Sequence, residues 1–284
     1  MEHDWVLYIA AFSTAFAISN VMTPVAKKIS LKLGAIDMPK ARGMHKKPMP
    51  RMGGIAIVAG FTLTVLLLYN FTEYSDMHKL TGYFIGAAMI VVLGMVDDVK
   101  NLPAKFKFAV QILAALVAVA FGIRIHIVMW PVTYALLKLS IPITVIWIVG
   151  LTNAVNLIDG LDGLATGVSS IAAICIMVLC ILTGDETSVV LTAALAGSCL
   201  GFLPRNFNPA EIFMGDTGAT FLGYTLAVTS ILGVFKGYAM IALMVSVLAV
   251  GFPIFDTLFA MTRRAARHQP IMQADRGHLH HKLI

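Results

Sequence analysis

Long apolar runs recur along the whole chain and restrict its fold more than any other feature of the sequence. They cover roughly 5–26, 52–71, 80–96, 106–123, 140–157, 164–183, 187–203, 217–235 and 238–262. About 20 consecutive apolar residues let a helix cross a bilayer, and 58% of the 284 residues are hydrophobic, above the ~45–50% of soluble domains. The runs therefore predict an all-α, polytopic helical membrane protein with about nine to ten transmembrane helices, forming a single domain over 1–284.

The basic residues predict which loops face the cytoplasm, because Lys and Arg concentrate in the cytoplasmic loops of membrane proteins. If the spans alternate, those loops are 27–51, 97–107, 152–163, 204–216 and 263–284, and they hold 17 of the 21 Lys and Arg residues. This bias predicts that the N-terminus lies outside. It also explains the net charge of +6 without a nucleic-acid partner.

Three smaller features complete the predicted organisation. Residues 125–139 are apolar but contain Pro131, so we expect an outer surface or re-entrant segment. Cys175, Cys180 and Cys199 lie inside apolar runs, where free cysteines pack as small hydrophobic residues. The sequence stops within its last basic loop, 263–284, which leaves open a further C-terminal helix.

Polar residues at a regular spacing mark the stretch LTNAVNLIDGLDGLATG (151–167). Asn153, Asn156, Asp159 and Asp162 follow one another at intervals of three residues, between two apolar runs. Polar groups beside lipid need a partner, and a cation or a polar ligand supplies one. The stretch predicts a helix end that opens into a glycine-rich polar loop; the alternative is a connector held by local side-chain turns.

A second polar motif follows the run 80–96. Asp97 and Asp98 are adjacent, and Asn101 and Lys107 come after them. Neighbouring carboxylates resist ionising together unless a cation compensates them, which suits a general base or a metal–phosphate site. The alternative is a solvated, capped helix end.

A third motif, FMGDTG (213–218), opens the run 217–235. Asp216 between two glycines suits a Mg²⁺ ligand beside a phosphate, because a helix N-terminus attracts anions. Alternatively, Asp216 is the N-cap of that helix. Phe213 suits either the core or a platform on which a base stacks.

The last loop is rich in basic residues and histidines, and it contains Arg263, Arg264, Arg276, His278, His280 and His281. No cysteine or carboxylate pattern completes a zinc site, so a patch facing phosphate groups fits better. Asp256, within the run 238–262, could pair with a basic residue or relay protons. Together the motifs predict a cytoplasm-facing site for Mg²⁺-dependent phosphoryl transfer onto a lipid.

In these motifs the chain resembles the polyprenyl-phosphate N-acetylhexosamine-1-phosphate transferases. The resemblance rests on PMPRMGG (48–54), VDDVKNL (96–102), NAVNLIDGLDGLATG (153–167), FMGDTGATFLG (213–223) and DRGHLHHKL (275–283). It implies a multi-pass enzyme of the bacterial inner membrane with a cytoplasm-facing active cleft. Such an enzyme moves GlcNAc-1-phosphate from UDP-GlcNAc to undecaprenyl phosphate, releases UMP and starts a cell-envelope polysaccharide. It also implies Mg²⁺ as the cofactor, with Mn²⁺ as an alternative, and leaves a homodimer open.

The resemblance also implies roles for the site residues. Asp216, with Asn156 or Asn153, would hold the metal; Asp97 would act as the base with support from Asp98. Asp159, Asp162, Asn101 and Phe213 would hold the uridine, while Lys107, Arg263, Arg264, Arg276, His278, His280 and His281 would offset phosphate charge. A covalent route with Asp97 or Asp159 as nucleophile stays open. The alternative hypotheses are the phospho-N-acetylmuramoyl-pentapeptide transferase of the same family and an ion or metabolite transporter.

Overall fold

The computed structural model describes residues 4–38, 48–68, 71–72, 76–125 and 133–233. In these residues the chain forms eight α-helices and one short pair of strands. They are α1 Trp5–Leu33, β1 Ile36–Asp37, β2 Met49–Pro50, α2 Gly54–Leu67, α3 Met77–Lys100, α4 Ala104–Ala120, α5 Thr133–Ile158, α6 Leu164–Thr183, α7 Glu186–Asn206 and α8 Gly215–Gly233. The strands are antiparallel, with Ile36 opposite Pro50. The sequence did not predict them, because two-residue strands carry no periodic pattern.

The prediction of a helical membrane protein is confirmed. Within the described residues, five helices are long and apolar enough to cross a bilayer: α1, α3, the part of α5 from Leu139 to Ile158, α6 and α7. The span count of nine to ten and the orientation stay predictions. The run 238–262, with Asp256, lies outside the described residues.

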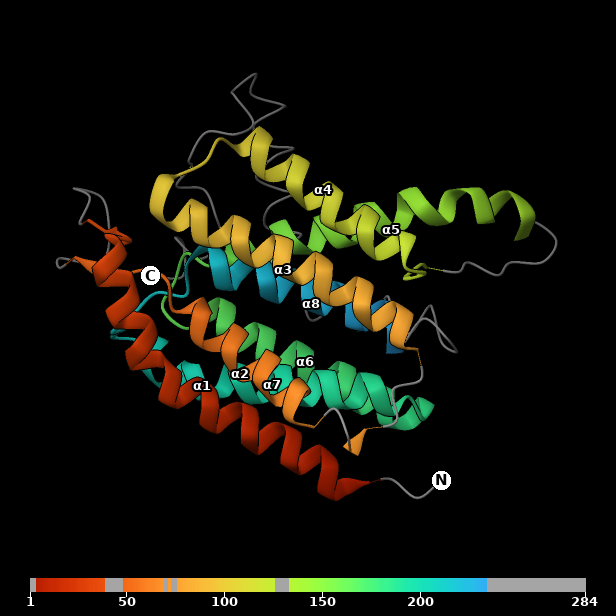
Figure 1. The fold of residues 1–284 in the computed structure, drawn as a ribbon, viewed down its shortest axis with the longest axis horizontal. Coiled ribbons are helices and arrows are strands. Elements are labelled where there is room, and N and C mark those ends of the chain that lie inside the picture. The colour runs from red at the N-terminus through yellow and green to blue at the C-terminus, as the bar shows by residue number, and fades with distance from the viewer. Residues whose placement is uncertain (1–3, 39–47, 69–70, 73–75, 126–132, 234–284) are drawn as a thin grey trace, which may run out of the picture.

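Helix α8 lies at the centre of the bundle. It packs against α2, α3, α5, α6 and α7, while α1 covers α2 and α7, and α4 covers α3 and α5 (Figure 1). From Thr217 to Gly233 every residue except Leu232 is buried. Some of its hydroxyl side chains bond to the helix's own backbone, as where Thr220 Oγ1 donates to the Asp216 carbonyl at 2.6 Å. Others bond to α3, as where the hydroxyls of Thr225 and Tyr83 lie 3.0 Å apart. A helix this polar can therefore occupy the middle of the bundle.

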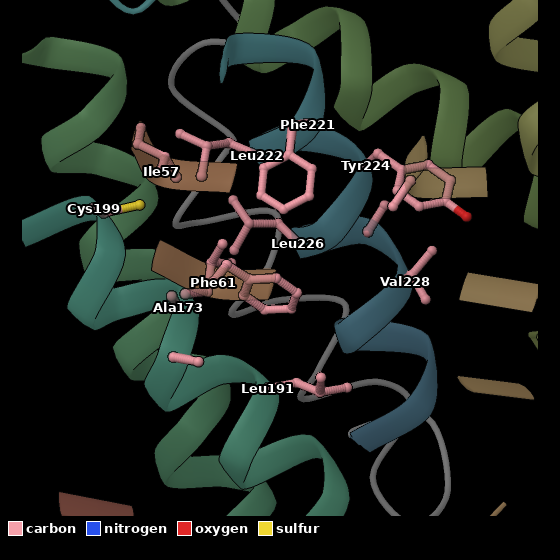
Figure 2. Packing of buried hydrophobic residues seen from close by; sticks show 14 of the residues in the cluster. Ile57, Phe61, Ala173, Leu191, Cys199, Phe221, Leu222, Tyr224, Leu226 and Val228 are labelled. Atoms are coloured by element: carbon pink, nitrogen blue, oxygen red, sulfur yellow. The ribbon is translucent and has the colours of Figure 1, made fainter. Parts of the chain in front are cut away.

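Apolar side chains of α8 fill the space between it and its neighbours. Figure 2 shows Phe221 and Leu226 of α8 gathered with Phe61 of α2 and Leu191 of α7. The rings of Phe61 and Phe221 meet edge to face with centroids 5.6 Å apart, a favoured aromatic geometry. This core fixes the position of α8 relative to α2 and α7.

A glycine contact brings α2 and α8 together near the start of both helices. A Cβ atom on Gly54 would lie 2.1 Å from the backbone nitrogen of Gly218. Small residues allow helix backbones to approach closely where lipid supplies no hydrophobic drive between helices. The contact places the first turn of α8, with Asp216, directly beside residues 50–54.

The described parts of the predicted polar motifs lie at one end of the bundle. Helices α1, α3, α5 and α7 end there, and α2, α4, α6 and α8 begin there (Figure 1). The described parts of the loops 27–51, 97–107, 152–163 and 204–216 therefore lie at the same end. This common end is what the alternation of spans predicted.

Several helix boundaries differ from those predicted. Helix α3 runs on to Lys100 and α5 to Ile158, so the residues expected in loops 97–107 and 152–163 lie partly on helices. Residues 133–139, predicted as an outer segment, form the first turns of α5. The predicted boundaries followed the loss of hydrophobicity, whereas a helix continues until its backbone hydrogen bonds end.

Candidate active site

The C-terminal end of α3 presents two buried carboxylates that point in different directions. Asp97 is 4% exposed and Asp98 is 3% exposed, so the alternative of a solvated helix end is wrong. Successive residues on a helix are turned by about 100°, which sends Asp97 toward α4 and Asp98 toward α8. Adjacent residues of the same type therefore have different partners.

Asp98 caps the first turn of α8 from outside that helix. Its Oδ1 accepts the backbone N–H of Asp216 at 2.9 Å, and its Oδ2 accepts the N–H and hydroxyl of Thr217 at 3.1 and 2.5 Å. Gly215 has a φ of 72°, and a Cβ there would lie 2.7 Å from the Asp98 carboxylate. Asp216 consequently sits in the first turn of α8, and its alternative role as N-cap is wrong.

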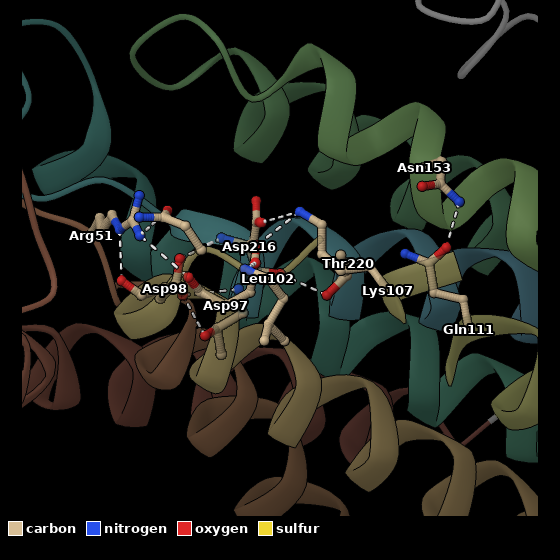
Figure 3. A network of polar contacts seen from close by, with 11 residues as sticks. Arg51, Asp97, Asp98, Leu102, Lys107, Gln111, Asn153, Asp216 and Thr220 are labelled. Carbon is tan, nitrogen blue, oxygen red and sulfur yellow. Dashed lines mark hydrogen bonds and ion pairs between the residues drawn. The ribbon is translucent and has the colours of Figure 1, made fainter. Parts of the chain in front are cut away.

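Lys107 joins Asp97 to Asp216. Its Nζ donates to Asp97 Oδ2 at 2.8 Å and to Asp216 Oδ2 at 3.0 Å (Figure 3). Asp97 also accepts the backbone N–H of Leu102 at 2.6 Å. The side chain of Asp97 is 6% exposed and that of Asp216 is 27% exposed, so the pair has one side open to solvent.

Gln111 and Asn153 form a second polar contact one helical turn from Lys107. Asn153 Nδ2 donates to Gln111 Oε1 at 2.6 Å and to the Val149 carbonyl at 2.8 Å (Figure 3). Gln111 is buried and was not among the predicted site residues. A signal for it exists, because a glutamine four residues after Lys107 in an apolar run lies on the same helix face.

Arg51 is a second residue that the sequence did not assign to the site. Its guanidinium donates to the carbonyls of Asp97 and Asp98 and to Asn101 Oδ1. Arg51 was counted in the basic loop 27–51 and in the motif PMPRMGG, but it was given no role. Its place two residues before the glycine pair of PMPRMGG was the available signal.

Asp159 lies beyond the end of α5 and is half-buried. Burial, followed by the nearby carboxylates of Asp216 and Asp98, raises the pKa of Asp159 to about 8. Asp162 Oδ2 accepts the backbone N–H of Ala210 at 3.0 Å. Asp159 therefore belongs to the electrostatic surroundings of the site, and Asp162 helps to fix the segment before α8.

The structure thus brings together five predicted residues directly. Asp97, Asp98, Asn101, Lys107 and Asp216 share one hydrogen-bonded network. Asn153 reaches the same face of α4 through Gln111, and Asn156 lies one turn further along α5. Phe213 joins residues 50–54 through its backbone. Outside the described residues lie Arg263, Arg264, Arg276, His278, His280 and His281.

The carboxylate oxygens of Asp216, and the amide oxygens of Asn156 and Asn153, are donors that suit a hard cation. Among the residues that the structure describes, no group of three or more His, Cys, Asp and Glu side chains is arranged to hold a metal. However, two carboxylates from different helices converge on one ammonium group. Mg²⁺ commonly takes one or two protein carboxylates and completes its shell with water and phosphate oxygens.

Comparison with known proteins finds relatives along the whole chain. The sequence model of glycosyl transferase family 4 matches residues 80–234. A probable undecaprenyl-phosphate N-acetylglucosaminyl 1-phosphate transferase of Bacillus subtilis (strain 168) is 40% identical, covering 100% of this chain and 79% of that protein. A decaprenyl-phosphate N-acetylglucosaminephosphotransferase of Mycobacterium tuberculosis (strain ATCC 25618 / H37Rv) is 35% identical, covering 95% of this chain and 74% of that protein. A phospho-N-acetylmuramoyl-pentapeptide-transferase of Staphylococcus carnosus (strain TM300) is 30% identical, covering 86% of this chain and 83% of that protein.

Proposed function

Because the chain belongs to glycosyl transferase family 4, we propose that it transfers GlcNAc-1-phosphate from UDP-GlcNAc to undecaprenyl phosphate. An oxygen of the lipid phosphate attacks the β-phosphorus of UDP-GlcNAc, and the bond to the UMP oxygen breaks. The products are lipid-diphosphate-GlcNAc and UMP. The observation that carries this proposal is the Asp97–Lys107–Asp216 cluster at one end of a membrane bundle, in a chain with such relatives over its full length.

Asp97 and Lys107 suit two requirements of this reaction, which are acceptance of a proton and compensation of negative charge. Asp97 would orient the lipid phosphate and accept its proton, with Asp98 holding the neighbouring turn of α8 in place. Lys107 would offset the negative charge that gathers as two phosphate-bearing substrates meet. Such transfers depend mainly on positioning and electrostatics, which a lysine held between two carboxylates supports.

The remaining residues would bind the substrates. Mg²⁺, or alternatively Mn²⁺, held by Asp216 with Asn156 or Asn153, would supply positive charge to the diphosphate. Asp159, Asp162, Asn101 and Phe213 would surround the uridine. Of the residues outside the described part, Arg263, Arg264, Arg276, His278, His280 and His281 would contact phosphate groups.

We place the enzyme in the bacterial inner membrane with the N-terminus outside and the site facing the cytoplasm. The support is the concentration of Lys and Arg in the loops at the site's end of the bundle. In this orientation the enzyme would start a cell-envelope polysaccharide from a cytoplasmic nucleotide sugar.

The test is UMP release by the purified full-length protein with undecaprenyl phosphate and each nucleotide sugar in turn. UDP-GlcNAc with Mg²⁺ should give UMP, and a chelator should abolish the release. Release only with UDP-MurNAc-pentapeptide would instead assign the activity of the Staphylococcus carnosus relative. No release with either donor would contradict the proposal and favour a transporter.

A second assay separates the two chemical routes. Labelled UMP is incubated with UDP-GlcNAc and enzyme in the absence of lipid. Exchange of label into UDP-GlcNAc would identify a covalent intermediate on Asp97 or Asp159, and its absence would support direct attack.

A further inference from the structure

The last carbonyls of α3 are bound by a single guanidinium group. Arg51 Nε donates to the Asp98 carbonyl at 2.8 Å, and Nη2 donates to the Asp97 carbonyl at 3.3 Å and to Asn101 Oδ1 at 2.8 Å (Figure 3). The Asp97 carbonyl also accepts the backbone N–H of Asn101 at 2.9 Å. The Asp98 carbonyl belongs to the last turn, whose carbonyls have no partner within the helix. A cation there also interacts favourably with the helix dipole. Arg51 therefore holds the backbone of both site aspartates.

The same contacts determine the direction of the Asp97 side chain. Asn101 adopts a left-handed backbone with a φ of 49°, and its side chain accepts a hydrogen bond from Arg51. The turn at Asn101 directs the Leu102 N–H onto Asp97 Oδ1. Arg51 thereby supports the turn that leaves the other oxygen of Asp97 directed at Lys107.

The segment 50–54 also binds the backbone of Phe213 and Met214, which lie just before Asp216 in the chain. Phe213 N donates to the Pro50 carbonyl at 2.9 Å, Gly53 N to the Phe213 carbonyl at 2.9 Å, and Gly54 N to the Met214 carbonyl at 2.8 Å. The Arg51 backbone is itself tied to the end of α1, because its N–H bonds to Ser30 Oγ at 3.0 Å. One short segment thus binds the end of α3 through a side chain and the residues that lead into α8 through its backbone.

We propose that Arg51 is a positioning residue, which sets the end of α3 against the start of α8 so that Asp97 and Asp216 meet at Lys107. The inference rests on the proposed transferase activity for its kinetic test. Lysine cannot replace Arg51 fully, since one ammonium group lacks the planar fork of donors that reaches both carbonyls and Asn101.

The kinetic test compares Arg51→Met and Arg51→Lys with a matched arginine elsewhere. Arg124 is the control, because its Nε donates to the Val119 carbonyl at 3.2 Å near the end of α4, at the other end of the bundle. Arg51→Met should lower kcat by about 10- to 100-fold with KM for UDP-GlcNAc within about threefold. Arg51→Lys should fall between Arg51→Met and wild type, and Arg124→Met should keep kcat within about twofold.

Thermal unfolding of each variant shows whether a loss of kcat reflects a loss of folded protein. A loss in Arg51→Met that matches its folded fraction, or a kcat within twofold of wild type, would overturn the inference. If Arg51→Met does not fold, Arg51→Lys decides: a lowered kcat at unchanged KM supports the role, and an unchanged kcat overturns it.

A distance measurement tests the same role without any activity. Spin labels are placed at Lys100→Cys and Glu211→Cys, both exposed positions, in a background whose native cysteines are replaced by alanine. Arg51→Met should broaden the distribution of label distances, whereas Arg124→Met should not. An unchanged distribution in Arg51→Met overturns the inference even if the wild type proves to have another activity.

Discussion

Lys107 is the residue on which the two halves of the site depend. Without its ammonium group, the carboxylates of Asp97 and Asp216 would face each other without compensation. We expect Lys107→Met to lower kcat by at least about 100-fold, since a fixed, partly buried group that stabilises charge in the transition state commonly contributes that much. UMP release by the purified variant measures the loss.

Lys105 provides the control for Lys107. It lies two residues earlier on the same helix and is exposed. Lys105→Met should stay within about threefold of wild type, as surface charges contribute little. Equal losses in both variants would mean that general positive charge near the membrane, rather than the carboxylate–lysine cluster, supports activity.

The raised pKa of Asp159 predicts that the stability of the folded protein depends on pH. The Asp159 carboxyl has a pKa of about 8 in the fold, against about 3.9 when unfolded, so the folded state binds this proton more strongly. The stability that Asp159 contributes is complete below pH 4 and is lost as the pH rises to 8. In chelator, Asp159→Asn should therefore gain thermal stability relative to wild type, with the difference growing by at least about 2 °C between pH 6 and pH 8.

The melting temperatures of wild type and Asp159→Asn over pH 5–9 check this expectation. Above pH 8 the difference should become constant. A difference that stays constant from pH 5 to pH 9 would show that Asp159 ionises normally in the folded protein.

At the residue scale the sequence predicted the chemical types of the site better than their partners. The motif spacing identified Asp97, Lys107 and Asp216 because polar groups are conspicuous in an apolar chain. It could not distinguish Asp98, since two adjacent aspartates look alike until the helix turns one toward α4 and the other toward α8. Arg51 was missed because its function depends on carbonyl groups, which every residue carries.

At the scale of elements, the start of α8 depends on a side chain from α3. Asp98 accepts three hydrogen bonds from Asp216 and Thr217 while only 3% exposed. Asp98→Ala leaves those donors buried without a partner, which costs about 1–3 kcal/mol for each such group. We expect a clear fall in melting temperature in detergent, together with loss of UMP release as Asp216 moves.

An ordinary helix cap offers the comparison. Asp76 caps α3 at the opposite end of the bundle, where it accepts the Lys79 N–H at 3.1 Å and its side chain is 37% exposed. Asp76→Ala should lose no more than about 1 kcal/mol and keep its activity. A smaller stability loss in Asp98→Ala than in Asp76→Ala would show that Asp98 does not hold α8.

The helices themselves were predictable, and their ends were not. Apolar runs located each described helix because lipid selects for hydrophobicity along a span. The ends of α3 and α5 carry polar residues that remain helical. At the end of α3, a bond from the distant Arg51 to the Asp98 carbonyl satisfies the backbone. Such long-range capping leaves no local pattern in the sequence.

At the scale of the whole molecule, the membrane-spanning helices place the site on one side of the bilayer. Helix α3 has 24 residues, so it is about 36 Å long and can cross a hydrocarbon core of about 30 Å. Met77 at its start and Lys100 at its end are both exposed. The loop charges predict that the Lys100 end faces the cytoplasm.

Cysteines introduced at these two positions test the orientation with a maleimide that cannot cross membranes. In a background without native cysteines, Lys100→Cys should react only in inverted vesicles, and Met77→Cys only in right-side-out vesicles. The opposite pattern would put Asp97 and Asp216 outside, away from cytoplasmic nucleotide sugars, and would contradict the proposed donor. Labelling of both positions from one side would show that α3 does not cross the membrane. Because one helix carries both reporters, a single pair of variants decides the side on which the site meets its substrates.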